Sequence, residues 1–564
     1  MNRYLLFIIF VAYGCGKQSR IGSFVHSQHP VLLALNAVLP TLLGYIILLL
    51  YLLVKHRIKL STYIFCMRKK KLFASVATVT VFGVFTRIIS FLFKIYLSRA
   101  LGAEAIGLYQ MALSVFFLFA SISASGIPLV LSRKTAEKMA TDGRADFSLF
   151  SSALLLGSSI ALSCVLVLTV LNRHLVFLFS EPSAYTIFAV TVPALLSTTI
   201  YSVIRGFFWG KKEFTAFSAT ETVEEILRIL FSVVFISGVI SGVSGAYAVA
   251  LAFTASDILI AVILFALFFF KGGRIAKPSS IKSILLPSLP VTAMRMFSSL
   301  MSTLIAFILP LRLISYGLSA AEATASYGRI AGMANPLLLA PNALIASLTI
   351  VLIPEMSANG AKKEFSLLNR HLNNGINFSF LISGVFMVAY IALGKEITSF
   401  LYADSVSGEY LQYAAYIMLP MCLMQLTQSA LNSIGKEMSS FLNYLAGNVV
   451  MLFLIWLLPP RIGIYSVAVA TFASFLISSI LNVYSLRKAV GFDFGFIKYL
   501  VMVSLFIFPS AFMADCLYSI TQGGAPIISL FFSAVTGVGA YCLLCLCTDL
   551  VDVKGFIKLR KKPS

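Results

Sequence analysis

The sequence is poor in charged residues, and acidic ones are scarcer than basic ones: Asp and Glu together number 21, against 43 Lys and Arg, in a chain of 564 residues. Charged residues make up 11% of the chain and hydrophobic residues 59%, with a mean hydropathy of +0.95. A soluble domain needs far more polar surface than this composition provides. The composition therefore excludes an ordinary soluble protein and indicates a polytopic membrane protein.

Signals for catalysis and metal binding are also missing from the sequence. The five His, at positions 26, 29, 56, 174 and 371, form no convincing ligand set. No phosphate loop, nucleophile elbow or HExxH motif is present. The eight Cys form no framework, and most lie within apolar segments, where a small polarizable side chain packs well. We predict that the protein is not an enzyme and uses no cofactor and no metal.

The net charge of +22 is carried largely by loops between apolar runs. If Arg68–Lys71 is cytoplasmic, the pairs Arg133/Lys134, Lys211/Lys212 and Lys362/Lys363 fall on the same side of the membrane. The positive-inside rule explains this distribution, so we expect no nucleic-acid binding. The protein is expected in the cytoplasmic membrane, with several spans.

Apolar runs of helix length predict an all-α protein with about 14 core spans. The first six cover roughly residues 72–98, 103–131, 148–172, 184–208, 214–239 and 244–270. The next six cover roughly 284–314, 322–354, 369–393, 408–433, 438–459 and 462–486. The last two cover roughly 496–517 and 525–548.

Residues 1–66 precede this core and form an N-terminal extension. Val31–Val54 is long enough to span a membrane, and basic residues follow it. Met67 is followed by four basic residues, and every motif used below lies downstream of it. Either the extension adds one N-terminal helix or the protein starts near Met67, and the sequence leaves both alternatives open.

An internal repeat organises the core. A shift of 218 residues aligns Lys94 with Arg312, Glu104 with Glu322 and Tyr109 with Tyr327. At the same shift, GAYAVALAFTAS from Gly245 meets GIYSVAVATFAS from Gly463. Each half has six spans, an even number, so the two halves enter the membrane from the same side as a parallel repeat. We predict an N-lobe (67–282), a C-lobe (283–490), and a C-terminal part (491–564) with two helices and a basic cytoplasmic tail.

Basic residues within the spans are the first functional signal. They are Arg87, Lys94, Arg295, Arg312 and Arg329. Arg87 lies about 15 residues, roughly 20 Å, beyond the start of its span, too deep to reach the inner surface easily. We interpret Arg87 and Arg295 as part of a cationic cavity between the lobes for an anionic headgroup, since guanidinium groups pair with phosphate oxygens. Ion pairs and snorkelling are the structural alternative, which best suits Lys94, Arg312 and Arg99 near the outer surface.

Acidic residues gather on the fifth span, in ETVEEILR from Glu221. Glu224 and Arg228 are four residues apart and can pair on one helical face, while Glu221 and Glu225 add negative charge. We expect a structural ion pair there, with a proton or cation site as the alternative. Asp257 is the only acid of the sixth span, and it is either a ligand for a coupling ion or a partner for a neighbouring helix.

Four motifs carry a family resemblance: LSRALGAEAIGLYQMA from Leu97, IRGFFWGKKEF from Ile204, the TVEEILRILF that follows, and GMANPLLLAPNALIASLTIVLIPEMS from Gly332. They resemble the stage V sporulation protein B branch of the multidrug/oligosaccharidyl-lipid/polysaccharide (MOP) exporter superfamily. The chain is similar, more distantly, to the lipid II flippases of that superfamily. The resemblance covers about residues 67–488, and residues 1–66 depart from it.

This resemblance implies a two-lobed flippase that alternates between inward-open and outward-open states. It would move an undecaprenyl-diphosphate-linked glycan, a peptidoglycan precursor for the spore cortex, across the cytoplasmic membrane. Flippases of the lipid II type use Arg on their first, second and eighth spans. Arg87 and Arg329 match that pattern by span, whereas the second span here has no deep basic residue. The Glu/Arg pair of the sporulation branch looks like Glu224 and Arg228.

Other functions remain open from the sequence. A cation-coupled multidrug exporter and an exporter of another lipid-linked polysaccharide share the fold. A membrane glycosyltransferase would need larger outer loops with clustered acids or His, and a scaffold that recruits cell-wall enzymes would not need deep Arg. The expected partners are a lipid-linked oligosaccharide, membrane lipid and cell-wall or sporulation proteins. The oligomeric state stays open, and nothing in the sequence requires more than a monomer.

Overall fold

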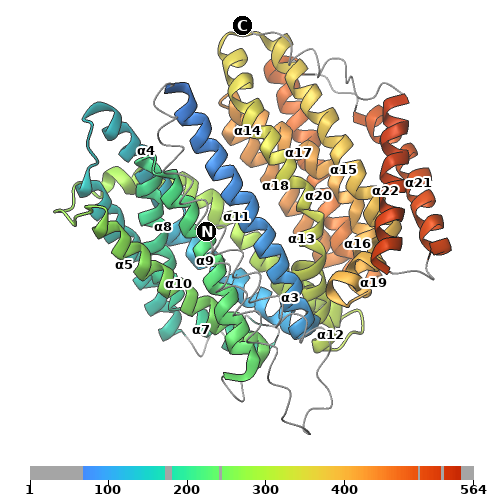
Figure 1. The fold of residues 1–564 in the computed structure, drawn as a ribbon, viewed down its shortest axis with the longest axis horizontal. Helices are drawn as coiled ribbons and strands as arrows, with labels where there is room; N and C mark the ends of the chain where they lie inside the picture. Colours follow the sequence, from blue (N-terminus) through green and yellow to red (C-terminus); the bar gives the residue numbers. More distant parts are fainter. Residues whose placement is uncertain are drawn as a thin grey trace, which may run out of the picture. The chain divides into compact units, whose positions relative to one another are not determined.

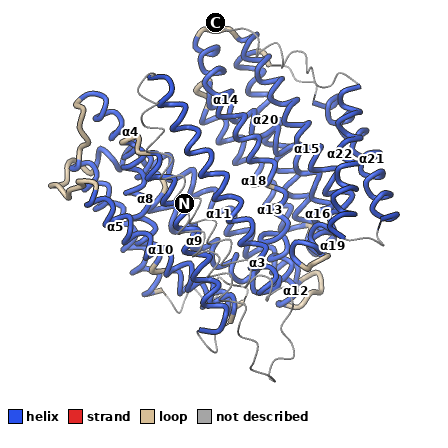
Figure 2. The backbone as a smooth tube through the Cα atoms, in the orientation of Figure 1, coloured by secondary structure: helices blue, strands red, loops and turns tan. Residues whose placement is uncertain are grey.

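The computed structural model describes residues 68–171, 179, 181–239, 244–492, 496–521 and 526–547. The predicted extension (1–66) and the basic C-terminal tail lie outside these residues. Two compact units divide the chain, Met1–Ala77 and Thr78–Ser564, and all contacts below lie within the second unit. The described residues form helices joined by short loops, with no strand among them (Figure 2).

The predicted N-lobe begins with one long helix, α3 (Arg68–Ala124). It continues through α4 (Gly126–Thr141), α5 (Phe147–Val170), α7 (Pro182–Thr191), α8 (Ala194–Gly210), α9 (Phe214–Val234), the π-helical η3 (Phe235–Val239) and α10 (Gly245–Phe270). A kink at Gly102, with φ +78° and ψ 174°, divides α3. Glycine adopts this φ without a steric penalty. The predicted boundary between the first and second spans falls at this kink.

The predicted C-lobe begins with α11 (Lys282–Ile314). It continues through α12 (Ala320–Gly328), η4 (Arg329–Ala334), α13 (Asn335–Leu338), α14 (Ala340–Ala361), α15 (Phe365–Tyr402), α16 (Val406–Ala414), η5 (Ala415–Ile417), α17 (Met418–Ser433), α18 (Glu437–Leu457), α19 (Pro459–Ile462) and α20 (Tyr465–Val490). Two further helices, α21 (Phe496–Thr521) and α22 (Pro526–Cys547), pack against each other and against α15 (Figure 1).

Ten of the described helices are long and apolar enough to cross a membrane, and α7 with α8, bent by 45°, would form an eleventh span. This finding confirms the prediction of an all-α, multi-pass membrane protein. The finer prediction of about 14 core spans remains a prediction. Part of the difference has a simple cause, because the stretch Val81–Thr141 counts as one helix of 61 residues and contains parts of two predicted spans.

The predicted eighth span (322–354) is a series of short helical segments, α12, η4, α13 and α14. Pro336 lies in the first turn of α13 and Pro341 in the first turn of α14. Proline has no backbone N–H, so it interrupts the hydrogen-bond ladder of a helix. The break also contains the π-helical segment η4, and such segments are frequent at functional sites.

The two predicted lobes pack their last three spans in the same way. In the N-lobe α10 contacts both α8 and α9, and in the C-lobe α20 contacts both α17 and α18. Small residues allow these helices to approach closely, as is common in membrane proteins. A Cβ on Gly447 of α18, for example, would lie 2.5 Å from the carbonyl oxygen of Ser474 on α20. The shared arrangement agrees with the repeat in the sequence.

Backbone contacts between α3 and α12 join the two predicted lobes. A Cβ on Gly107 would lie 2.1 Å from the Thr324 carbonyl oxygen, and one on Gly328 would lie 2.0 Å from the Ala103 carbonyl oxygen. Any larger residue at these positions would overlap the facing backbone. Along the second span, this contact lies at the end opposite the basic loop 133–144, which is the predicted outer end. α11 also packs against α4.

Candidate functional site

Arg228 of α9 lies at the centre of a buried charged cluster. Its Nη2 is 2.5 Å from Oε1 of Glu224, and its Nη1 is 2.8 Å from Oε2 of Glu225. The three side chains are only 11–18% exposed. Because the spacings are four and three residues, all three lie on one helical face. The structure thus contains the ion pair expected between Glu224 and Arg228, and Glu225 joins it.

Asp257 reaches the same guanidinium from the neighbouring helix, α10. Its Oδ1 lies 3.8 Å from Nη2 of Arg228, and the Thr198 hydroxyl of α8 donates a hydrogen bond to its Oδ2. The Asp257 side chain is 5% exposed. Asp257 therefore connects α8, α9 and α10. This is the geometry expected if Asp257 is a partner for a neighbouring helix.

Glu221 lies one turn before this cluster on α9 and has a separate partner. One of its carboxylate oxygens is 3.4 Å from Nη2 of Arg205 on α8. The Glu221 side chain is 46% exposed, so water screens this pair more than it screens the cluster around Arg228. A second link between α8 and α9 follows from this contact.

Acid exceeds base in the buried part of the cluster. Glu224, Glu225 and Asp257 surround the single guanidinium of Arg228, so three ionised carboxylates against one cation would leave two uncompensated negative charges. Uncompensated buried charge costs several kcal/mol per ion. Lys94, which is half-buried on α3, is attracted by the charge of Glu225 and supplies part of the compensation. Among the described residues, the cluster therefore contains more buried carboxylates than cations.

Arg87 and Arg295 are exposed, and no hydrogen bond or ion pair holds either one within the part of the chain that the structure describes. Each lies in a stretch with few packing contacts. None of the residues Val81–Ile88 on α3 is buried, and neither is any residue from Leu289 to Leu300 on α11. The two deepest predicted cations are therefore exposed and make no hydrogen bond or ion pair with any described residue.

Arg312 and Arg329 are held by other groups. The Nε of Arg312 donates to the Trp456 carbonyl at 2.8 Å, and its guanidinium lies 4.7 Å from the centre of the Trp456 ring. The Nε of Arg329 lies 2.9 Å from Oδ2 of Asp404, in the turn between α15 and α16. The five predicted basic residues therefore share no common partner. Arg312 fits the structural alternative, and a substrate role for any of the five remains a prediction.

Arg99 of α3 makes a contact between the predicted lobes that we did not anticipate. Its Nε donates to the Leu401 carbonyl at 2.8 Å, and its Nη2 donates to the Phe400 carbonyl. Both carbonyls belong to the last turn of α15, where helix carbonyls have no intrahelical partner and carry partial negative charge. A cation from the N-lobe thus caps a helix of the C-lobe.

Residues 72–359 match the model of the family described as polysaccharide biosynthesis protein. The chain belongs to this family. Among curated relatives, stage V sporulation protein B of Bacillus subtilis (strain 168) is 23% identical over 497 residues, which cover 83% of this chain and 94% of the relative. Sporulation protein YkvU of the same organism is 23% identical over 396 residues, with 66% and 85% covered.

Two solved structures share the fold of this chain. A lipid II flippase, MurJ, in an inward closed conformation has a TM-score of 0.66 at 15% identity, with 84% of this chain and 99% of that chain covered. A multidrug resistance MATE family transporter of the MOP superfamily, in an inward-facing conformation, has a TM-score of 0.62 at 15% identity, with 72% and 94% covered. This member of the polysaccharide biosynthesis protein family therefore shares the fold of these two membrane transporters.

The sequence alone did not identify several polar contacts of this family member. Thr198 is the hydrogen-bond partner of Asp257, Asp404 is the partner of Arg329, and Arg99 caps α15. Each contact joins residues at least 59 positions apart, so no helical spacing rule could have paired them. Arg205, the partner of Glu221, had a sequence signal, because it lies in the IRGFFWG motif that carries the family resemblance.

Proposed function

We propose that this protein translocates an undecaprenyl-diphosphate-linked glycan, of the peptidoglycan-precursor class, across the cytoplasmic membrane. The observation that carries the proposal is the state of Arg87 and Arg295, two exposed guanidinium groups at depth without an acidic partner among the described residues. Charges within spans are costly and mark substrate paths. A diphosphate supplies the anionic oxygens that such groups bind best.

The exposure around Arg295 supports an interior cavity. Ala293, Met294, Arg295 and Met296 are all exposed, although they are consecutive. Four consecutive helical residues span about 300°, so together they face most directions around the helix. A helix in a lipid-facing bundle exposes one side to lipid, and exposure on the remaining sides requires open space within the protein. The headgroup would occupy that space.

The architecture proposed for this transporter has about 14 core spans in two lobes, 67–282 and 283–490, with α21 and α22 outside the repeat. The matching packing of α8, α9 and α10 with α17, α18 and α20 supports this division. Alternating access would come from rocking of one lobe against the other. The lipid tail would remain in the bilayer while the headgroup crosses between the lobes.

Energy for the cycle would enter through the cluster of Glu224, Glu225, Asp257 and Arg228, with Glu221 as an outlying member. Its surplus of carboxylates favours binding of a proton or a monovalent cation. A multidrug exporter is less well supported, because these acids already face Arg228 and do not present themselves to a cationic drug. The names of the curated relatives support a use in sporulation.

The proposal is tested by translocation of lipid-linked precursor in cells that lack other flippases. We expect Arg87→Ala and Arg295→Ala each to reduce translocation by about tenfold or more, the effect of one charged hydrogen bond. Arg133→Ala is the matched control, because Arg133 is also an exposed arginine but pairs with Glu137 on α4. Wild-type translocation by both variants, at normal membrane levels, would overturn the proposal.

A second measurement addresses the biological setting. Depleting the protein from its host should cause lipid-linked precursor to accumulate on the inner leaflet, and the accumulation is scored in growing and in sporulating cells. Accumulation confined to sporulation would support a flippase dedicated to the spore cortex. Accumulation in neither condition would shift the proposal to another lipid-linked polysaccharide or to drug export.

A further inference from the structure

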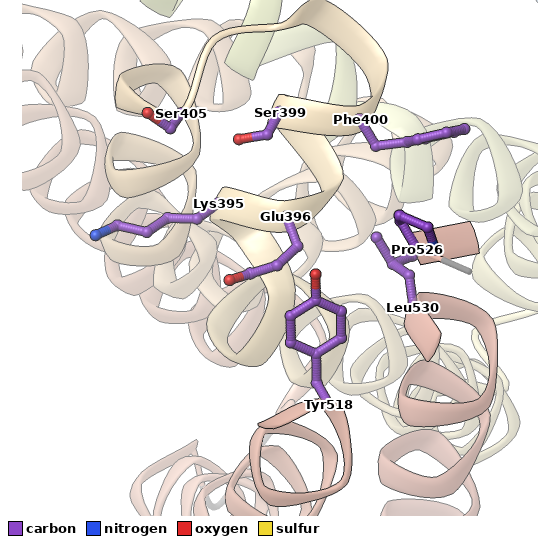
Figure 3. A pocket seen from close by; sticks show the side chains of 8 residues that line it. All are labelled: Lys395, Glu396, Ser399, Phe400, Ser405, Tyr518, Pro526 and Leu530. Atoms are coloured by element: carbon purple, nitrogen blue, oxygen red, sulfur yellow. The ribbon is translucent and has the colours of Figure 1, made fainter. Parts of the chain in front are cut away.

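A cavity of about 400 Å³ lies where α15 meets α21 and α22. Figure 3 shows its wall, in which Lys395, Glu396, Ser399 and Phe400 come from α15 and Tyr518 comes from α21. The wall combines one carboxylate and several hydroxyl groups with apolar and aromatic surfaces. Such a combination suits a small polar group attached to an apolar body.

The carboxylate of Glu396 is the unusual feature of this cavity. Its Oε2 is shielded from water and accepts no hydrogen bond from any residue that the structure describes. Lys395 is adjacent in sequence but points away (Figure 3), and its Nζ lies 2.8 Å from the Glu409 carboxylate. The intervening residues 522–525, Gln-Gly-Gly-Ala, carry no ionisable side chain. The cavity thus has a buried acceptor, and the one cation among its described lining residues, Lys395, is paired with Glu409 instead.

The depth of the cavity fits the headgroup region of the outer leaflet. Glu396 lies six residues before the end of α15 at Tyr402, hence about 9 Å from that end. The basic loops mark the opposite end of the same helix, where Lys362 and Lys363 precede it. Apolar side chains near the cavity are exposed, among them Phe400 (44%), Ile520 (81%) and Ile527 (60%). They would face acyl chains.

We infer that this cavity binds the primary ammonium headgroup of an outer-leaflet phospholipid, as in phosphatidylethanolamine. An ammonium group carries three N–H donors and a positive charge, so it satisfies the Glu396 carboxylate through charge-assisted hydrogen bonds. A quaternary trimethylammonium group carries the same charge but has no N–H donor. The Glu396 site therefore distinguishes the two headgroups. This inference does not depend on which glycan the protein carries.

The test uses the full-length protein purified in nanodiscs and lipid retention measured by native mass spectrometry. The nanodiscs contain phosphatidylglycerol with an equal share of either phosphatidylethanolamine or phosphatidylcholine. We expect phosphatidylethanolamine to be retained about tenfold more than phosphatidylcholine, as one charged hydrogen bond would provide. Glu396→Gln should remove this preference. Glu104→Gln, the matched control, removes an exposed acid at the same predicted outer end, outside the cavity lining, and should preserve it.

Three results would overturn the inference. The first is equal retention of the two lipids by the wild-type protein, and the second is an unchanged preference in Glu396→Gln. The third is stabilisation by sodium or potassium in phosphatidylglycerol alone that Glu396→Gln abolishes, which would make this a metal-cation site. Soluble glycerophosphoethanolamine, which has the headgroup but no acyl chains, is added as a competitor. Competition only at a far higher concentration than that of the lipid supports a lipid site. Translocation assays on the same variants keep this question apart from the proposed transport function.

Discussion

The last three spans of the two predicted lobes pack alike but bury opposite kinds of polar group. In the N-lobe, α8, α9 and α10 enclose the ionic cluster around Arg228. In the C-lobe, α17, α18 and α20 enclose a neutral network. There the Asn443 amide donates to Oδ1 of Asn482 at 2.9 Å and to the Ser485 hydroxyl at 3.1 Å, and the Asn482 amide donates to Thr427 at 3.3 Å.

This difference means that the charge of the N-lobe cluster can change when an ion or proton binds, whereas the charge of the C-lobe network cannot. Amides and hydroxyls keep the same charge at every physiological pH, so the C-lobe network holds its helices together without sensing ions. Surplus carboxylates change their net charge when a proton or cation binds. The comparison therefore favours the predicted N-lobe for the proposed binding of a proton or cation. The neutral network of the predicted C-lobe would keep its helices in place during that step.

Removing Arg228 should have the largest effect, because it leaves three buried carboxylates without their shared cation. We expect Arg228→Met to lower the free energy of unfolding by about 3–5 kcal/mol, as for other broken buried ion pairs. The measurement is thermal unfolding of the purified protein in detergent. In the C-lobe, Asn443→Ala removes neutral hydrogen bonds and should cost about 1–2 kcal/mol.

A variant with fewer unpaired charges tests whether the Arg228 effect comes from charge or from lost packing. Glu224→Gln and Glu225→Gln, combined with Arg228→Met, leave Asp257 as the one acid of the cluster and should restore most of the lost stability. If the triple variant is no more stable than Arg228→Met alone, lost packing rather than unpaired charge explains the effect.

Asp257 should matter more for coupling than for stability. Asp257→Asn keeps the size of the side chain and removes the charge, so we expect the rate of translocation to fall about tenfold and to lose its dependence on a proton or sodium gradient. Asn482→Ala on α20, the corresponding helix of the C-lobe, should leave that dependence intact. A gradient dependence that survives in Asp257→Asn would remove Asp257 from the coupling site.

Arg99 and Arg312 offer a matched pair of helix-capping arginines at the predicted outer end. Arg99 caps α15 across the lobes, whereas Arg312 of α11 caps α18 within the C-lobe. We expect Arg99→Ala to broaden the distance between spin labels at Glu104 and Tyr413, in a background without native Cys, because a charge-assisted contact between lobes is lost. Arg312→Ala should leave that distance unchanged. Equal broadening in both variants would show general loosening instead.

The smallest effect should appear at the start of the third spans, where the repeat aligns Asp146 with Glu364. Asp146 caps α5 by accepting from the Ser148 backbone N–H at 2.8 Å, whereas Glu364 makes no side-chain cap on α15. We expect Asp146→Ala to cost about 1 kcal/mol of unfolding free energy and Glu364→Ala to cost little. Thermal unfolding of the two variants measures the difference.

The Asp146 cap also predicts a dependence on pH. Burial raises the pKa of Asp146, but hydrogen bonds from Ser148 and Leu149 outweigh burial and hold the pKa below its ordinary value of 3.8. A carboxyl with a lowered folded-state pKa stabilises the fold above its unfolded-state pKa, and this stabilisation is lost as pH falls through the folded-state pKa. The difference between wild type and Asp146→Ala should therefore persist at neutral pH and shrink below about pH 4. A difference that does not change with pH would contradict the capping role.

Sequence reasoning predicted the class of the molecule better than its polar contacts. Helix-length apolar runs determine the all-α class, and the Glu224/Arg228 pair follows from spacing on one helix. The partners of Arg312 and Arg329 could not be predicted from local spacing, since Trp456 and Asp404 come from distant segments. The cavity beside Glu396 was also missed, because a cavity depends on how α15, α21 and α22 pack. Local patterns report on one helix, and contacts between helices depend on the whole fold.

The backbone contact of Gly107 with Thr324 and of Gly328 with Ala103 has a mechanical meaning. Two helices that touch backbone to backbone at one end have a fulcrum there. A helix that crosses a bilayer is about 30 Å long, so a rotation of about 20° around that end moves the other end by roughly 10 Å. In the proposed transport cycle, small angular changes at these two glycines would therefore separate the far ends of the helices on the opposite side of the membrane.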